Sequence, residues 1–426
     1  MEKLQIKNFA GLKEVTIEVK PITGFIGPQA SGKSVIAKLL YFFREISSRL
    51  PRAVAEGMDN VEYKAECREK FKRYFPIENT RASDFEITHW SDSENVRVVF
   101  SRDKATSVET TSLEWSDFFP AAIEKLTLKI QPILNQHGKV DEEAVSTRLA
   151  LREKYDEEAS KVLGPSSRYE QFFIPAGRAF FSQLNTSIFT SIEAGESFDP
   201  FLVAFGSLLE RSKGLMETSE IFGSSGTRLD QFCRFALKTI MGAEISPIGK
   251  QDFLRFDDGR RVKLAQASSG QQEVFPLLIL LAQFLAFGHA RGRAVYIEEP
   301  EAHLFPSTQK QIVEFIASVF RARQRKMSLV LTTHSPYILT SINNLLQAGR
   351  LYGGASYVVR KRLESVIPLS RTLKPGEVAF YALENGSAKS IVDGETGLID
   401  AAVIDEVSDE IATQFDELLL EGNEKR

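Results

Sequence analysis

The sequence predicts an α/β fold built around a parallel sheet, and three observations lead to this fold class. Short apolar runs typical of strands are separated by longer stretches with helical patterning. A glycine-rich stretch, GPQASGKS at residues 27–34, follows the strand-like run ITGFI and precedes the helix-like run VIAKLLYFF. Two later apolar runs, RAVYI and SLVLT, end in polar residues. Because α/β sites are built where strands and helices end, these polar residues are expected to form a site.

The first forty residues predict a β-rich start of the fold. KLQIKNF and EVTIEVK alternate apolar and polar residues like two strands around the turn AGLK, which predicts a hairpin. PITGFIG then predicts a short buried strand that leads into the glycine-rich stretch.

The glycine-rich stretch matches the phosphate-binding pattern G-x-x-x-x-G-K-[ST] in the strand–loop–helix context that this pattern requires. Glycine at the two fixed positions lets consecutive N–H groups face phosphate oxygens at the positive end of the following helix. A chance match is the alternative, since the four fixed positions arise by accident in roughly one or two chains per hundred of this length. We predict that the lysine reaches the β- and γ-phosphates and that the serine hydroxyl ligates Mg²⁺. The predicted loop consists of Gly27, Pro28, Gln29, Ala30, Ser31, Gly32, Lys33 and Ser34.

Composition predicts a soluble, globular, cytoplasmic protein. The 426 residues are 43% hydrophobic and 26% charged with a formal net charge of −4, so composition indicates no indiscriminate binding to nucleic acid. Cys67 and Cys233 are too far apart and lack the spacing of a disulfide framework or zinc site. No apolar run has the length of a signal peptide core or membrane span, so an exported or membrane-spanning protein is not expected.

Residues 46–165 are predicted to form a mainly helical insertion. VEYKAECREKFKRYF and VSTRLALREKYDEEASKVL are charged and helical, with one strand candidate, NVRVVFS, between them. Without a sustained heptad repeat, a compact helical subdomain is favoured over a coiled-coil arm. The basic cluster Lys64, Arg68, Lys70, Lys72 and Arg73 is a candidate phosphate-binding patch, but Glu62, Glu66 and Glu69 are interleaved with it. A solvated helix face is therefore the favoured interpretation.

The chain is expected to return to the sheet after residue 165. YEQFFIPAGR predicts a strand, a second helical stretch follows, and DFLRFDDG with RRVKLAQ predicts a hairpin that turns at Gly259. The hairpin leads into SSGQQE at residues 268–273, directly before an apolar helix. Taken alone, Ser-Ser-Gly at this point is most often a helix cap.

Paired carboxylates and a histidine follow two further buried strands. Glu298 and Glu299 end the run RAVYIEE, and His334 ends the run KMSLVLTTH. A nucleotide hydrolase with a phosphate-binding loop needs one carboxylate for Mg²⁺ and another to orient the attacking water. A lone histidine at a strand end is usually structural, but its position beside these motifs favours a functional role.

The four motifs together resemble the ABC-type ATPase head of the RecF, SMC and OLD proteins. They look most like the compact prokaryotic AAA-family ATPases of phage-defence operons, such as PARIS- and Septu-type subunits. The resemblance runs from LQIKNFAGL to THSPYIL and extends towards LKPGEVAFYALENGSAKSI. It implies a P-loop NTPase fold of ABC-ATPase type with an N-terminal antiparallel β portion and helical insertions. It also implies an ATPase that uses ATP and Mg²⁺.

The resemblance assigns expected roles residue by residue. Glu298 falls at the acidic position that holds Mg²⁺ together with Ser34. Glu299 falls at the catalytic glutamate, and His334 at the histidine that contacts the γ-phosphate. Ser269, Gly270 and Gln272 are implied to contact the nucleotide of a partner subunit, and residues 300–303 to cross the dimer interface.

Three residues depart from the family pattern. The acidic metal position carries Glu298 where ABC proteins usually carry aspartate, although EEPEAHL is typical of the OLD-like branch. Gln271 replaces the second glycine of the signature motif. No glutamine follows FFIPAGR, so the residue that couples the insertion to the metal is not identified, and Arg178 is a candidate for another polar role.

The C-terminal stretch, residues 391–426, is predicted to form an acidic amphipathic helix. From residue 393 onward it contains eleven acidic and two basic residues. Its helically spaced apolar stripe comprises Ile404, Val407, Ile411, Phe415 and Leu418. Packing against the core is favoured over a partner-docking role. The predicted ATPase domain then comprises residues 1–45 and 166–390.

These features predict an ATP-hydrolysing switch that dimerises, or forms a higher homo-oligomer, through composite sites and controls a separate nuclease or toxin. The resemblance favours the ATPase or sensor subunit of an anti-phage system. One alternative is a RecF- or SMC-like ATPase of DNA repair or chromosome maintenance, and another is a transporter ATPase subunit, against which EEPEAHL argues. No acidic metal cluster of the Toprim type is appended, so nuclease activity is expected on another chain.

Overall fold

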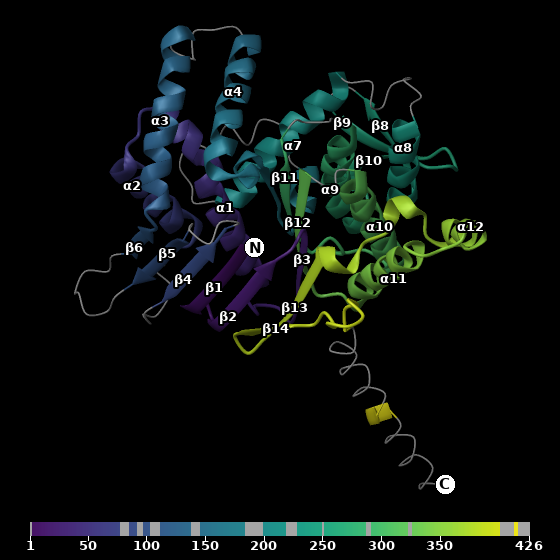
Figure 1. Ribbon diagram of the computed structural model, residues 1–426. Coiled ribbons are helices and arrows are strands. Elements are labelled where there is room, and N and C mark those ends of the chain that lie inside the picture. The colour runs from purple at the N-terminus through teal and green to yellow at the C-terminus, as the bar shows by residue number, and fades with distance from the viewer. Residues whose placement is uncertain are drawn as a thin grey trace.

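A mixed sheet of eleven strands runs through the protein in the order β6-β5-β4-β1-β2-β14-β13-β3-β12-β11-β7. The computed structural model (Figure 1) describes residues 2–76, 85–91, 97–102, 111–137, 145–183, 199–218, 228–248, 251–286, 291–322, 326–400 and 413–415. The strands of this sheet are β1 (Glu2–Phe9), β2 (Leu12–Val19), β3 (Ile22–Ile26), β4 (Glu86–Trp90), β5 (Arg97–Arg102), β6 (Thr111–Trp115), β7 (Glu170–Ile174), β11 (Arg293–Glu298), β12 (Met327–Thr333), β13 (Val378–Glu384) and β14 (Ser387–Ser390).

The sheet has an antiparallel part and a parallel part. β1 and β2 form the predicted N-terminal hairpin, and β4, β5 and β6 continue it in antiparallel pairing from β1 outward. β13, β3, β12, β11 and β7 are all mutually parallel. β14 joins the two parts, pairing antiparallel with β13 and parallel with β2. The predicted fold class is therefore confirmed, with its antiparallel N-terminal portion.

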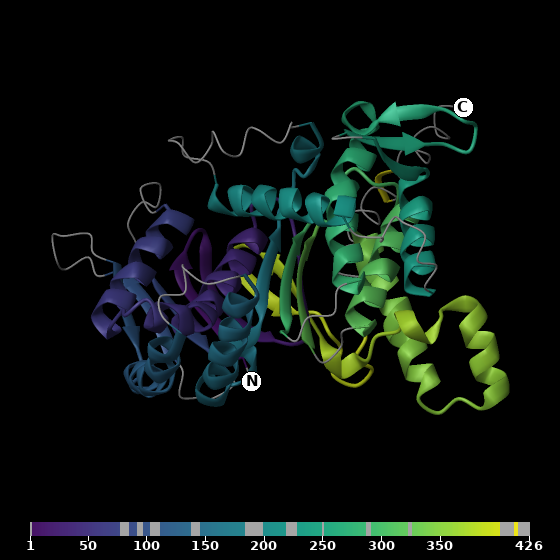
Figure 2. The ribbon, with the colours of Figure 1, turned by 90° about the horizontal axis from the view of Figure 1, so that it is seen from above.

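Helices cover both faces of the sheet, as Figure 2 shows. They are α1 (Lys33–Ala55), α2 (Asn60–Tyr74), α3 (Phe118–His137), α4 (Val145–Leu163), α5 (Ala179–Gln183), α7 (Pro200–Thr218), α8 (Arg228–Met241), α9 (Ser269–Ala286), α10 (Pro306–Ala322), α11 (Pro336–Tyr352) and α12 (Tyr357–Val366). Short 3₁₀ turns lie at Pro165–Arg168, Leu264–Gln266, Leu369–Arg371 and Pro375–Glu377.

The central strands alternate between two hydrophobic cores. In β11, Val295 and Ile297 belong to the core shared with α8 to α11, whereas Ala294 and Tyr296 belong to the core shared with α1 to α4. Because successive side chains of a strand point to opposite faces, helices on both faces require strands that are apolar throughout. This explains why the segments RAVYI and SLVLT are apolar at almost every position.

A second, three-stranded antiparallel sheet leads to the start of α9. It comprises β8 (Glu244–Ile248), β9 (Gln251–Arg255) and β10 (Arg261–Lys263). β9 and β10 form the predicted hairpin, and Gly259 in its turn has a φ of 88°, a conformation that glycine adopts without strain.

The segment predicted as a helical insertion shares its core with the N-terminal strands. The predicted boundary at residue 45 lies inside α1, whose buried stripe continues through Ile46, Leu50 and Val54. β4 pairs with β1, so this segment also lengthens the main sheet. Apolar residues of α3 and α4 join the same core as β1 and β2. The described parts of residues 46–165 thus pack with the N-terminal strands of the main sheet.

The basic residues of this segment mostly face acidic or aromatic neighbours. On α2, Lys70 pairs with Glu45 at 2.9 Å and Lys72 with Glu69 at 2.7 Å. Lys64 lies over the ring of Trp115. This arrangement fits the solvated helix face favoured from the sequence.

Of the predicted C-terminal apolar stripe, Ile404, Val407, Ile411 and Leu418 lie outside the described residues. Phe415, which is described, is 60% exposed. The preceding chain is anchored to α11, because the side chain of Asn343 bonds both the carbonyl oxygen and the amide of Ile399.

Candidate functional site

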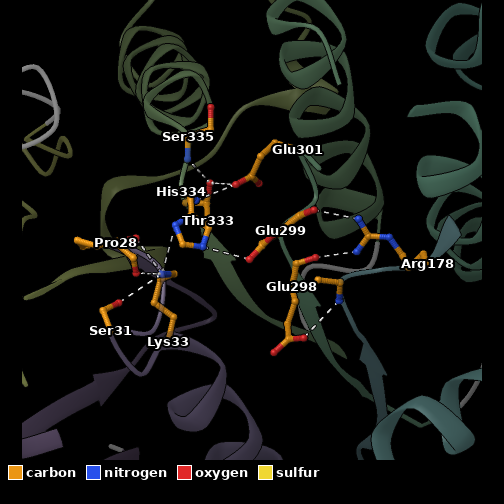
Figure 3. Close-up of polar contacts among 12 residues, drawn as sticks. Pro28, Ser31, Lys33, Arg178, Glu298, Glu299, Glu301, Thr333, His334 and Ser335 are labelled. Carbon is orange, nitrogen blue, oxygen red and sulfur yellow. Dashed lines mark hydrogen bonds and ion pairs between the residues drawn. The ribbon is translucent and has the colours of Figure 1, made fainter. Parts of the chain in front are cut away.

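Four loops meet at the C-terminal edge of the parallel strands (Figure 3). The strand order β3-β12-β11-β7 and the register pairs Ile26 with Thr333, Glu298 with Thr332, and Ile297 with Ile174 align the strand ends. The glycine-rich loop follows β3, His334 follows β12, Glu299 follows β11 and Arg178 lies in the loop after β7. The predicted catalytic residues are therefore neighbours at one edge of the sheet.

The glycine-rich loop needs glycine at both fixed positions. Gly27 has a φ of 153°, and a Cβ there would lie 2.3 Å from the carbonyl oxygen of Leu383. Gly32 has a φ of 96°, and its Cβ would lie 2.6 Å from Leu12. Both substitutions would strain the backbone and collide with neighbours. The loop delivers the chain to the N-terminus of α1, where Ser34 is exposed in the first turn.

Lys33 is folded over its own loop. Its Nζ donates to the carbonyl oxygens of Gly27 at 2.8 Å and Pro28 at 2.7 Å, and to the hydroxyl of Ser31 at 3.3 Å. Burial lowers the pKa of Lys33, while the carboxylates of Glu299 and Glu301 oppose that shift. The ammonium therefore lies where the loop surrounds it with acceptors, next to the carboxylates of the site.

His334 lies between Lys33 and Glu299. Its Nδ1 is 3.5 Å from Nζ of Lys33, and its Nε2 is 3.1 Å from Oε1 of Glu299. Because an ammonium can only donate, Nδ1 faces it as the acceptor, and Nε2 then carries the proton that it donates to the carboxylate. The two neighbours thus select one tautomer of His334.

Glu301 holds the backbone of His334 in place. Its Oε1 accepts from the Thr333 hydroxyl at 2.7 Å and from the His334 amide at 2.8 Å. Burial raises the pKa of Glu301, and the nearby charge of Glu299 adds to this, although the two hydrogen bonds oppose it. The sequence places Glu301 only in the segment 300–303 that is expected to cross the dimer interface, and it does not indicate this contact with Thr333 and His334.

Glu298, the predicted metal ligand, is only 7% exposed. Its Oε2 accepts from the amide of Ala176 at 3.3 Å. Its Oε1 is buried and has no hydrogen-bond partner in the described part of the chain. A buried carboxylate oxygen left without a donor is costly unless a cation or water satisfies it.

The family of this chain follows from its sequence. A model of the family described as "AAA domain, putative AbiEii toxin, Type IV TA system" matches residues 22–340. The chain belongs to this AAA-domain family. No curated protein matches the sequence significantly.

Similar solved structures include SMC heads and an ABC cassette. The SMC head domain from Thermotoga maritima has 11% identity and a TM-score of 0.35 over 91% of this chain and 97% of its own. An Smc head domain from Pyrococcus furiosus, bound to the C-terminal domain of ScpA, has 10% identity and a TM-score of 0.38 over 97% and 100%. A dimeric bacterial ABC transporter cassette has 11% identity and a TM-score of 0.31 over 91% and 97%.

Within this AAA-domain protein, Arg178 occupies the loop in which the sequence lacks a glutamine. The Arg178 side chain is fully buried and bonds the carbonyl oxygens of Glu298 at 2.7 Å and Glu299 at 2.9 Å. Its counter-charge is Glu273, which is 1% exposed. Glu273 was assigned no role from the sequence of SSGQQE. The signal was its position one turn into α9, directly before the apolar run VFPLLILL, where the helix is buried and a carboxylate needs a partner.

In the SSGQQE segment, Ser268 and Gln271 cap helix α9, and Ser269 between them is exposed. Ser268 exchanges hydrogen bonds with Gln271, whose amide donates to the Ser268 hydroxyl while its side-chain oxygen accepts from the Ser268 amide. This is the capping-box arrangement at the start of α9. Ser269 is exposed. A Cβ on Gly270 would lie 2.6 Å from the carbonyl oxygen of His303, so glycine is needed there for close packing.

Gln272 points into its own chain. It is 7% exposed, and its Nε2 donates to the carbonyl oxygens of Ala265 at 3.1 Å and Ala267 at 2.9 Å. The side chain thereby holds the loop before α9. Both N–H donors of the Gln272 side-chain amide are therefore used within its own chain.

No helix among the described residues is long and apolar enough to span a membrane. Cys67, on α2, is a buried free thiol, and Cys233, on α8, is also buried.

Proposed function

We propose that this protein is a cytoplasmic ATP-binding and ATP-hydrolysing switch that dimerises through composite sites and controls a separate effector. The observation that carries the proposal is the contact series from Lys33 to His334 to Glu299 at the edge of the sheet. Phosphoryl transfer to water uses a cation that binds the phosphates and a group that orients the attacking water, and Lys33 and Glu299 supply these two groups on either side of His334.

The site fits ATP with Mg²⁺. The N-terminus of α1 and the glycine-rich loop present N–H groups to an anion, and Ser34 is exposed beside them. Glu298 contributes the unpartnered buried Oε1. The described residues include no group of three or more His, Cys, Asp and Glu side chains around a metal. Mg²⁺ usually binds one or two protein ligands together with phosphates and water, and Ser34, Glu298 and ATP would supply such a set. When bound, Mg²⁺ neutralises charge on the β- and γ-phosphates and orients them.

The protein's own residues then have distinct roles. Lys33 releases the loop carbonyls and binds the phosphates. Glu299, with its side chain 36% exposed, is placed to orient and polarise the attacking water. His334 turns from Glu299 towards the γ-phosphate and thereby distinguishes ATP from ADP.

The N-terminus of α9 is the part of the protein that we propose to complete the nucleotide site of a second copy. Ser269 is exposed at a helix N-terminus whose own cap is supplied by Ser268, so its hydroxyl and the helix end face outward. We propose that this end contacts the nucleotide held by the Lys33 of a second copy. The carbonyl of His303 lies against Gly270, and the segment from Pro300 to His303 is proposed to line the same interface.

We further propose that the effector is a nuclease or toxin in an anti-phage system. The description of the matched family, which names a type IV toxin–antitoxin system, supports a two-component role. The alternative of a DNA-repair ATPase is less well supported, because three of the five basic residues of α2, Lys64, Lys70 and Lys72, are paired or stacked as described above.

Two substitutions at the site test the ATPase assignment. Lys33→Ala is expected to abolish ATP binding, because the lysine contacts ground-state phosphates. Glu299→Gln is expected to retain ATP and stop turnover, because the glutamate acts only on the attacking water. Equilibrium titration with ATP and phosphate release measure the two effects. Equal loss of ATP binding in both variants, or no turnover by the unmodified chain, would refute the assignment.

A further inference from the structure

The guanidinium of Arg178 has five N–H donors, and four hydrogen bonds and one ion pair within the protein surround it. Nε donates to the carbonyl oxygen of Glu273 at 3.1 Å. Nη1 donates to the carbonyl oxygens of Pro175 at 2.9 Å and Glu298 at 2.7 Å. Nη2 donates to the carbonyl oxygen of Glu299 at 2.9 Å and lies 3.3 Å from Oε1 of Glu273. With the side chain fully buried, these contacts leave no donor for solvent or ligand.

Two of the five acceptors are the consecutive carbonyls of Glu298 and Glu299. Between them the chain turns sharply, because Glu299 has a φ of 42°, a conformation that is unfavourable for a residue with a Cβ. The turn sends the two carboxylates in different directions, as Figure 3 shows. Glu298 reaches the amide of Ala176, and Glu299 reaches Nε2 of His334. A single planar guanidinium thus bonds both peptides that determine where the carboxylates point.

Glu273 ties this arrangement to α9. Its Oε1 accepts from the amide of Arg178 at 2.9 Å, and its Oε2 accepts from the amide of Ala179 at 2.7 Å. Glu273 lies one turn beyond Ser269 on the same helix. The loop after β7, the end of β11 and the start of α9 are therefore joined through one buried ion pair.

We propose that Arg178 is a positioning residue for the catalytic glutamate, with Glu273 as its counter-charge. The proposal rests on the ATPase function proposed above. Arg178 has no contact with the phosphate-binding loop among its hydrogen bonds and acts only by holding the turn that carries Glu298 and Glu299. Its loss should therefore slow hydrolysis while ATP still binds at Lys33.

Arg178→Lys is the most direct test, because it keeps the charge but supplies three donors for five acceptors. The turn should then be held loosely, and displacement of a reacting group by about 1 Å lowers turnover by about 10²-fold. We expect that loss in kcat, with the Kd for ATP unchanged within about twofold. Circular dichroism at the assay temperature verifies that the chain is folded.

Arg293→Lys is the matched control. Arg293 is also a buried arginine, lies at the opposite end of the same strand β11, and donates to the carbonyl oxygen of Phe284 at the end of α9. Its replacement perturbs the same two elements far from the strand-end turn, so turnover should stay within about twofold of the unmodified protein. Glu273→Gln, which keeps the shape and removes the counter-charge, is a second variant should Arg178→Lys not fold, and we expect it to lower kcat about tenfold.

The possible results separate the two proposals. Normal kcat in folded Arg178→Lys and Glu273→Gln would overturn the positioning role and leave the ATPase assignment intact. A loss of ATP affinity equal to the loss of kcat would also overturn it, because a general structural defect would then explain both. No ATP turnover by the unmodified chain would refute the proposed function and the positioning role with it.

Discussion

The start of α9 allows the cap and the proposed nucleotide contact to be separated by single substitutions. Ser268 supplies the cap through its hydroxyl and amide, whereas the adjacent Ser269 is exposed in the first turn. Ser268→Ala should therefore lower the free energy of unfolding by about 1 kcal/mol, the usual loss for a helix cap. Ser269→Arg should change it by no more than about 1 kcal/mol, since it leaves the cap intact and adds one cation near the positive helix end.

The two substitutions should have the opposite order of effect on hydrolysis. Ser268→Ala should leave turnover near the unmodified level once the helix is formed. Ser269→Arg should abolish it, because a long cation would occupy the space in which the partner's phosphates are proposed to lie. Urea denaturation and phosphate release, measured on the same preparations, give both quantities.

Mixing two inactive variants tests whether the site is shared between chains. A Lys33→Ala chain lacks the lysine that binds phosphate but keeps Ser269. A Ser269→Arg chain keeps the intact phosphate-binding loop but lacks the serine proposed to contact the partner's nucleotide. At equal amounts with random exchange, about half of the dimers are mixed, and each has one complete site of two. Turnover should then recover to about a quarter of the unmodified level if the sites are independent. If the sites are coupled, ATP-dependent dimerisation should recover instead.

Two results would refute this reasoning. Full turnover by Ser269→Arg alone would leave the serine without a role in the site. Background values for both turnover and dimerisation after verified subunit exchange would remove the composite site.

Three further predictions follow from the site and the cores. His334→Ala should hydrolyse ATP at least about tenfold more slowly, through loss of one transition-state contact, and near-normal phosphate release would show that the histidine is structural. The charges of Arg44 and His89, against the opposing effect of burial, hold the pKa of the Glu2 carboxyl well below its usual range. Glu2→Gln should therefore lower the free energy of unfolding by about 3 kcal/mol at pH 7. Because a lowered pKa stabilises the fold only above the pKa of the unfolded state, this difference should shrink as the pH falls below the ordinary value of 4.5, and a pH-independent difference in urea denaturation would contradict it. Burial raises the pKa of the Cys67 thiol to about 12, so iodoacetamide at pH 8 should modify the native chain far more slowly than the urea-unfolded chain, and equal rates would contradict the burial.

Local patterns were sufficient to predict the elements that carry the site. The hairpin of β1 and β2, the buried strand β3 and its glycine-rich loop, and the strands β11 and β12 all lie where the sequence predicts them. Each depends on residues close together in the chain, through alternation, turn chemistry or helical spacing.

Strand pairings and side-chain contacts between residues far apart in the sequence were predicted less well. β5 lies at the predicted strand NVRVVFS, whereas β4 and β6 were not predicted, because nothing local indicates that β4 pairs with β1. The family resemblance implied that Gln272 contacts a nucleotide. In the structure its side-chain amide donates hydrogen bonds to the carbonyl oxygens of Ala265 and Ala267. The roles of Glu273 and Glu301 appear only when their partners from other elements are in place.

The sequence by itself determined which chemical groups are available and that each lies at the end of a strand or helix. Only the tertiary structure decided that Lys33 and His334, 301 residues apart, become neighbours, and that Arg178 joins the turn carrying Glu298 and Glu299 to the helix of Glu273. The physical reason is that side-chain periodicity specifies local backbone conformation and which face is buried. Which strands lie next to each other depends instead on the packing of two cores against opposite faces of one sheet, and that packing involves the whole chain at once.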